Sequence, residues 1–206
     1  AMRPGLDDEL SDLWVYEFGR GTMTRLTFEG DNGGHIWSPD SRQLIFGSET
    51  KSRPHALVAI LADGSGTPKL LLNSDERHLP MAITPDGRTL IVRRDKGTGA
   101  GQSSAYLTLP LLPDPSAPAT PKPLLDSPTA MGPLALSPDG KWAAYESSES
   151  GREEIYVVPF PEPNRKYQIS TDGGTRPLWN RNARELFFRG RPDMMAIPVD
   201  TTPAFR

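Results

Sequence analysis

The sequence predicts an all-β protein built from about four repeats of a four-stranded antiparallel unit, the arrangement of a β-propeller blade. A motif of apolar segment, tight turn and second apolar segment occurs four times, and its turn residues Pro39, Pro85, Pro138 and Arg181 are 46, 53 and 43 residues apart. That spacing is the usual period of a propeller blade. The composition agrees, because 22 prolines and 19 glycines in 206 residues suit short strands joined by turns.

Each motif is expected to form the hairpin between the first two strands of a blade. The four copies read HIWSPDSRQLIFGS, MAITPDGRTLIVRR, LALSPDGKWAAYES and PLWNRNARELFFRG. Proline sets φ for the turn, and an Asp side chain accepts hydrogen bonds from nearby backbone amides. Asp40, Asp86 and Asp139 are therefore predicted to cap turns and not to carry chemistry, since the same residue recurs once per repeat.

Third and fourth strands are expected to complete each repeat. The predicted third strands are 56–61, 105–109, 155–160 and 194–199, and the predicted fourth strands are 68–72, 122–125 and 166–169. His55 is expected in a loop before the first of these strands. Loops are also expected at 95–105, which is rich in glycine, and at 110–123, which is rich in proline. The acidic segment 6–14 has the composition of a single helical turn.

The whole chain is interpreted as one propeller-type domain, residues 1–206. It divides into a partial blade at 12–28 and repeats at about 29–73, 74–126, 127–170 and 171–206. The partial blade resembles third and fourth strands, and the last repeat supplies three strands. Either the N-terminal pair completes the last sheet and closes a four-bladed ring, or the chain is an open arc. We favour the open arc, in which a homodimer would bury the end faces.

Aromatic residues at equivalent positions are expected to pack between blades. Trp37 and Trp179 share one position on the first strands. Trp14 and Tyr156 fall at neighbouring positions on third strands. A third set, on the second strands, comprises Phe46, Tyr145 and Phe188.

Charge and motifs exclude several classes of function. The net charge is −3 and the basic residues are scattered, so no nucleic-acid surface is predicted. The chain has no cysteine and no apolar run of transmembrane length. His35, His55 and His78 lack zinc-ligand spacing. We therefore predict no catalytic residue, no metal and no cofactor.

A ligand site at the rim of the propeller channel is the site hypothesis that the sequence supports. His35 and His78 are expected near the inner strands. Asp31 and Asp172 each precede an inner strand, within Asp-Asn-Gly-Gly and Asp-Gly-Gly. These four residues are candidates for binding a ligand, although turn formation and packing explain them as well.

The repeat resembles the TolB-like, WD40-related β-propeller family. The matching residues are WSPDSRQLIF, TPDGRTLIV, SPDGKWAAY and DLWVYEFGRGTMTRLT, and the resemblance extends over residues 13–199. The fourth copy departs from the family pattern, with Asn-Arg-Asn-Ala at its turn. The last third, residues 151–205, resembles the C-terminal propeller of bacterial eukaryotic-like serine/threonine protein kinases. The resemblance implies a bacterial protein in the periplasm or another extracytoplasmic compartment.

The leading functional interpretation is a non-catalytic binding module, a sensor-like part of a larger signalling protein or assembly. Its partner would be a protein or a small-molecule ligand at the propeller face. One alternative is the propeller of a prolyl oligopeptidase-type peptidase or other hydrolase. Another is a lyase or lactonase with its site at the channel mouth.

Overall fold

The computed structural model describes residues 11–97, 103–111, 120–201 and 205, and the ordered elements among them are all β-strands. The expected helical turn at 6–14 falls largely outside this range, as do parts of the loops expected at 95–105 and 110–123. The strands are β1 (Trp14–Glu17), β2 (Thr22–Arg25), β3 (Asp31–Trp37), β4 (Gln43–Thr50), β5 (Arg53–Leu61), β6 (Lys69–Asn73), β7 (His78–Ile83), β8 (Thr89–Lys96), β9 (Ser103–Pro110), β10 (Lys122–Ser127), β11 (Met131–Leu136), β12 (Trp142–Ser147), β13 (Glu154–Pro159), β14 (Tyr167–Gln168), β15 (Thr175–Trp179), β16 (Glu185–Arg189) and β17 (Met194–Pro198).

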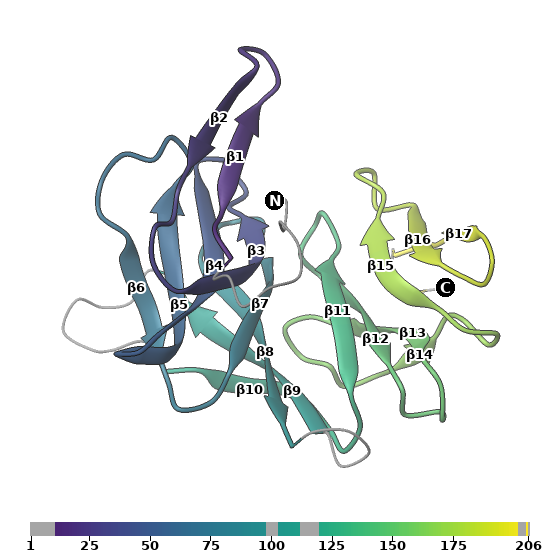
Figure 1. Cartoon of the computed structure of the whole chain (residues 1–206). Helices are drawn as coiled ribbons and strands as arrows, with labels where there is room; N and C mark the ends of the chain where they lie inside the picture. The colour runs from purple at the N-terminus through teal and green to yellow at the C-terminus, as the bar shows by residue number, and fades with distance from the viewer. Residues whose placement is uncertain (1–10, 98–102, 112–119, 202–204, 206) are drawn as a thin grey trace.

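The strands form antiparallel meanders that follow the chain order. β3–β6, β7–β10 and β11–β14 are four-stranded sheets, β1–β2 is a hairpin, and β15–β17 is a three-stranded sheet. Successive first strands contact one another, β3 with β7, β7 with β11, and β11 with β15. The sheets are thus arranged as blades in an open arc, with the hairpin near one end and β15–β17 at the other (Figure 1). The predicted all-β propeller architecture is confirmed.

In each repeat the turn between the first two strands has a side-chain acceptor that accepts a hydrogen bond from the backbone amide two residues later. In the second repeat, the Thr84 hydroxyl donates to Asp86 Oδ1 at 2.6 Å, and the Arg88 amide donates to the same oxygen at 3.0 Å. These bonds lower the pKa of Asp86. The equivalent acceptors in the other repeats are Asp40, Asp139 and, in the divergent fourth copy, Asn182. The aspartates therefore cap turns, as expected.

Every first strand carries a β-bulge or irregularity, where its register against the second strand shifts by one residue. In β3 the bulge includes Gly34 at φ 57°, and in β15 it includes Arg176 at φ 54°. Such a φ favours glycine, so a backbone strain of about 1 kcal/mol is held at Arg176. The Arg176 amide donates to Glu146 Oε2 at 3.1 Å, and partial burial raises the pKa of Glu146.

Apolar residues on alternating sides of each strand form the cores between neighbouring sheets. Ile45 and Leu57 face the second full sheet, whereas Leu44 and Phe46 face the N-terminal hairpin. The same alternation in the later sheets creates the remaining two clusters of buried residues. Each complete sheet therefore has one face toward the preceding sheet and one toward the following sheet.

The hairpin β1–β2 repeats the packing of third and fourth strands. The Leu13 amide donates to Thr27 Oγ1 at 2.8 Å, and the Ile155 amide donates to Ser170 Oγ at 2.8 Å. Backbone bonds from Leu26 to Leu13 and from Ile169 to Ile155 also correspond, both at 2.8 Å. The hairpin therefore has the hydrogen-bond pattern of the third and fourth strands of a blade.

Three expectations were wrong. His55 lies in β5 and not in a loop, because that strand begins two residues earlier. Trp14 is 39% exposed, since no described sheet precedes the hairpin. Trp37 is 46% exposed, whereas Trp179 is buried and its indole N–H donates to the Ala135 carbonyl of the preceding first strand. Among the described residues, the hairpin that precedes the first full sheet includes no first strand whose carbonyl could accept a hydrogen bond from Trp37. Phe46, Tyr145 and Phe188 are buried, as expected.

Candidate binding site at the propeller rim

A cavity of about 680 Å³ opens at the rim where the first strands begin, between the last two sheets. Arg152 and Glu153 line it from the residues before β13, and Asp172–Gly174 line it from the loop before β15. The end of β16 and the turn that follows contribute Arg189 and Arg191. The cavity thus collects charged side chains from three separate segments.

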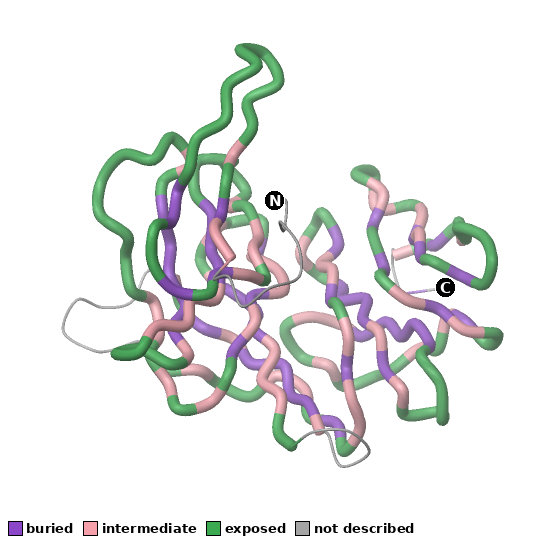
Figure 2. The backbone as a smooth tube through the Cα atoms, in the orientation of Figure 1, coloured by how far each residue is buried: buried purple, intermediate pink, exposed green. Residues whose placement is uncertain are grey.

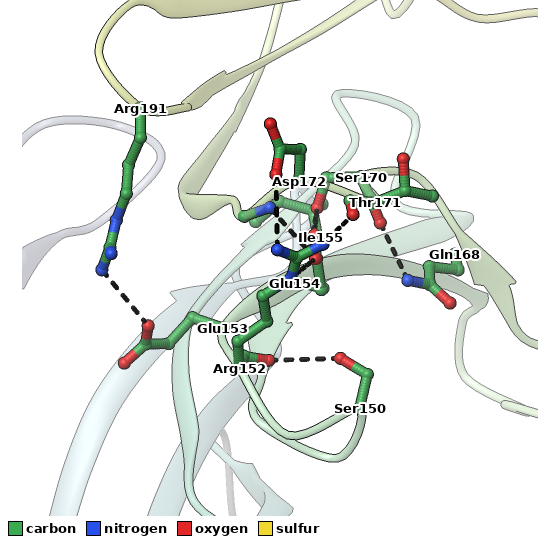
Figure 3. A network of polar contacts seen from close by, with 11 residues as sticks. Ser150, Arg152, Glu153, Glu154, Ile155, Gln168, Ser170, Thr171, Asp172 and Arg191 are labelled. Carbon is green, nitrogen blue, oxygen red and sulfur yellow. Dashed lines mark hydrogen bonds and ion pairs between the residues drawn. The ribbon is translucent and has the colours of Figure 1, made fainter.

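A buried carboxylate anchors one wall of this cavity. Glu154 is 1% exposed and accepts hydrogen bonds from the Ser170 hydroxyl, from Arg152 Nε at 2.7 Å and from the Gly173 amide at 3.0 Å (Figure 3). Burial by itself would raise the pKa of Glu154, but these hydrogen bonds and the Arg152 charge outweigh it and lower the pKa. The ionised carboxylate therefore fixes Arg152 and the loop before β15.

Arg152 joins the buried anchor to the surface. Its guanidinium also donates to the Thr171 carbonyl and to Asp172 Oδ1, the latter at 3.3 Å (Figure 3). The Asp172 side chain is otherwise almost fully exposed. Arg152 is thereby satisfied within the protein, and it positions Asp172 at the cavity mouth.

The other two arginines of the cavity, Arg189 and Arg191, have fewer interactions with the described residues than Arg152 has. Arg191 Nη2 lies 3.8 Å from Glu153 Oε2, a long and exposed ion pair. In the part of the chain that the structure describes, the guanidinium of Arg189 makes no hydrogen bond or ion pair. Arginine presents a planar set of donors that matches a carboxylate or phosphate. The cavity can therefore accept an anionic group beside Arg189.

Three of the four sequence-predicted site residues line cavities at this rim, but they do not converge. Asp172 lines the large cavity, whereas Asp31 and His78 line a small cavity of about 50 Å³ between the first two full sheets. His78 is buried, its Nδ1–H donates to the Glu76 carbonyl at 2.8 Å, and burial lowers its pKa. His35 is not among the residues lining either cavity, and partial burial lowers its pKa.

Sequence reasoning missed the basic residues of the large cavity. Arg152, Arg189 and Arg191 come from two sheets and from turns, and single exposed arginines carry no local signal of a site. The one available clue was Arg189-Gly190-Arg191, a basic tripeptide at the end of a predicted strand. Its relation to Asp172 depends on how the last two sheets pack.

A second cavity of about 540 Å³ lies at the opposite rim, between the first two full sheets. Apolar side chains such as Ile45, Leu71 and Ile83 line it, together with the turn residues Asp40 and Asp86. Those two carboxylates already cap their own turns. The described residues include no group of three or more His, Asp or Glu side chains placed to hold a metal ion. No helix among them is long and apolar enough to span a bilayer.

Comparisons with known proteins bear on the fold. No family model matches the sequence, and no curated protein matches it. Among solved structures, a TolB from Agrobacterium tumefaciens is similar, with a TM-score of 0.67, 17% identity and coverage of 86% of this chain and 62% of that one. TolB from Acinetobacter baumannii has a TM-score of 0.69 and 14% identity, and coverage is 91% of this chain and 45% of that one.

A puromycin-hydrolysing peptidase of Mycobacterium tuberculosis is also similar, with a TM-score of 0.68 and 15% identity, and the match covers 96% of this chain and 35% of the peptidase. The chain therefore spans between about a third and two thirds of the length of these three structures. At such identities the likeness concerns the fold alone. With its repeated sheets and aspartate-capped turns, this chain has the TolB-like β-propeller fold.

Proposed function

We propose that this chain is a non-catalytic binding module, a sensor-like part of a larger signalling protein or assembly, and that its ligand binds in the rim cavity beside Arg189. One observation carries the proposal: a cavity of about 680 Å³ is lined in part by Arg189, whose guanidinium has no partner among the described residues. Cavities of several hundred Å³ are of the size that binds small ligands or peptide ends.

The chemistry of the cavity favours a ligand that bears a carboxylate. Arg152 is neutralised by Glu154 and Asp172, and Arg191 lies near Glu153. Arg189 is left as the positive charge that a ligand can complement. A protein with an exposed acidic side chain, or a small carboxylic acid, would satisfy it. We propose the periplasm or another extracytoplasmic compartment as the place where this occurs, which rests on the family resemblance.

Citrate provides a simple probe of this proposal. We expect citrate to raise the melting temperature of the wild-type chain, and Arg189→Ala to weaken the apparent affinity by about tenfold, or 1.4 kcal/mol. Arg181→Ala is the matched control. Arg181 is also exposed, but it lies in the turn between β15 and β16, at the opposite rim from the cavity. An equal response of the two variants would contradict an anion site at Arg189.

The second candidate is the propeller part of a peptidase or other hydrolase. The likeness to the puromycin-hydrolysing peptidase favours it. This chain matches only 35% of that peptidase, so a catalytic part would lie in the remainder, outside the region of likeness. Titration with puromycin separates the two candidates. Saturable binding that Arg189→Ala leaves unchanged would favour the hydrolase interpretation over the anion-sensing one.

A further inference from the structure

The outer face of the last sheet is equivalent to faces that are buried elsewhere in the protein. Ile45, Ile91 and Ala144 hold the same position on the second strands of the three complete sheets, and each is buried against the following sheet. Phe187 holds that position on β16. It is only half-buried, because no described sheet follows.

Neighbouring residues extend this uncovered surface. Leu178 pairs with Phe187 across the strands and is 60% exposed, whereas its equivalents Ile36, Ala82 and Ala135 pack into cores. Ala196 pairs with Phe187 from the other side. We name this surface the trailing face, and it consists of Leu178, Phe187, Met194 and Ala196. Arg189, which pairs with Met194, borders it on the side of the rim cavity. It is an apolar sheet face, which soluble proteins rarely leave open.

The opposite end of the arc carries the complementary surface. Trp14 pairs with Arg25, and Tyr16 pairs with Met23, so these side chains share one side of the hairpin. The opposite side holds Val15 and packs on the first full sheet. Tyr16 is 49% exposed and Met23 is 51% exposed. We name the surface formed by Trp14, Tyr16 and Met23 the leading face (Figure 2 shows the hairpin largely exposed).

Comparison of the hairpin with the third and fourth strands of the third complete sheet indicates which kind of surface the leading face can pack against. The hydrogen bonds of the hairpin align Leu13 with Ile155, so Trp14 aligns with Tyr156 and Tyr16 with Val158. Tyr156 and Val158 are buried against the preceding sheet. The leading face therefore corresponds to the sheet surface that packs, in the cores between blades, on the outer side of the preceding sheet. The trailing face is such an outer side.

We propose that copies of this chain associate head to tail, with the trailing face of one copy packed on the leading face of the next. The structure favours a second copy as the partner. Its leading face is equivalent to the surfaces that cover the counterparts of the trailing face in each core between sheets. The two faces lie toward opposite ends of the arc within one chain (Figure 1). Such an interface is heterologous, and the angle between copies decides whether a ring closes.

Light scattering of the full chain with two variants tests the pairing. Wild type is expected to exceed its 22.6 kDa monomer mass in a concentration-dependent way. Tyr16→Glu blocks the leading face and Leu178→Glu blocks the trailing face, so each variant alone should remain largely monomeric, because every contact needs one intact face of each kind. Each variant alone should weaken association at least tenfold. Mixed in equal amounts, they retain one intact pair of faces and should form a dimer of the two variants.

Leu70→Glu is the matched control, because Leu70 is 45% exposed on β6 of the first full sheet, away from both faces. It should associate like wild type. Circular dichroism checks that each variant is folded, and serine replacements serve if a glutamate variant is not. A monomeric wild type overturns the proposal, and so does a mixture that stays monomeric. Citrate binding is measured independently, so failure of one proposal is distinguishable from failure of the other.

Discussion

At the scale of single residues, Glu154 combines the deepest burial of any described carboxylate with three hydrogen-bond donors around it. Replacing it with Gln removes the charge that holds Arg152 and exchanges an acceptor for a donor. We expect Glu154→Gln to lower the free energy of unfolding at neutral pH by about 1–3 kcal/mol. Urea denaturation measures this, and Glu162→Gln, on an exposed loop, is the matched control that should change little.

The same residue predicts a pH dependence. Because the folded state lowers the pKa of Glu154 below its ordinary value of 4.5, the unfolded state binds the proton more tightly. Its stabilising contribution is therefore complete well above pH 4.5 and is lost as the pH falls through the lowered pKa. The difference in unfolding free energy between wild type and Glu154→Gln should shrink on acidification. A difference that is constant between pH 7 and pH 3 would contradict this account.

At the scale of elements, equivalent strands differ in whether a sheet follows them. Ile91 on β8 is fully buried between two complete sheets, and Ile91→Ala should cost about 2–4 kcal/mol of stability. Phe187→Ala at the equivalent position of β16 removes a larger side chain yet should cost less than about 1 kcal/mol in the monomer. Chemical denaturation at low protein concentration compares them. A greater loss for Phe187→Ala would show that its outer face is covered within one chain.

At the scale of the whole molecule, each sheet contacts only its neighbours, so stability should fall toward the ends of the arc. Amide hydrogen exchange is expected to be slowest in β8, β9, β12 and β13, which lie in sheets covered on both sides. It should be fastest in β1 and β2. Mass spectrometry of exchanged peptides at low concentration measures the gradient. Uniform protection across the chain would indicate that the arc opens only by global unfolding.

Comparison of particular residues shows what could be predicted. The turns at Asp40, Asp86 and Asp139 were predictable because their contacts lie within five residues along the chain. The burial of Trp14 and Trp37 was predicted wrongly, since it depends on whether another sheet stands in front of them. In the candidate site, Asp172 was named as a candidate from its loop and stays a prediction, whereas its contact with Arg152 and its place in one cavity with Arg189 were not predicted.

The sequence by itself determined the repeat, the strand order and the capped turns, because these depend on local hydrogen bonds and on the alternation of apolar residues. Only the tertiary structure decided which faces are covered, how Arg152, Asp172 and Arg189 come to share one cavity, and that the arc remains open. The physical reason is that packing between sheets joins residues from separate repeats, and the same strand pattern is compatible with a covered or an uncovered face.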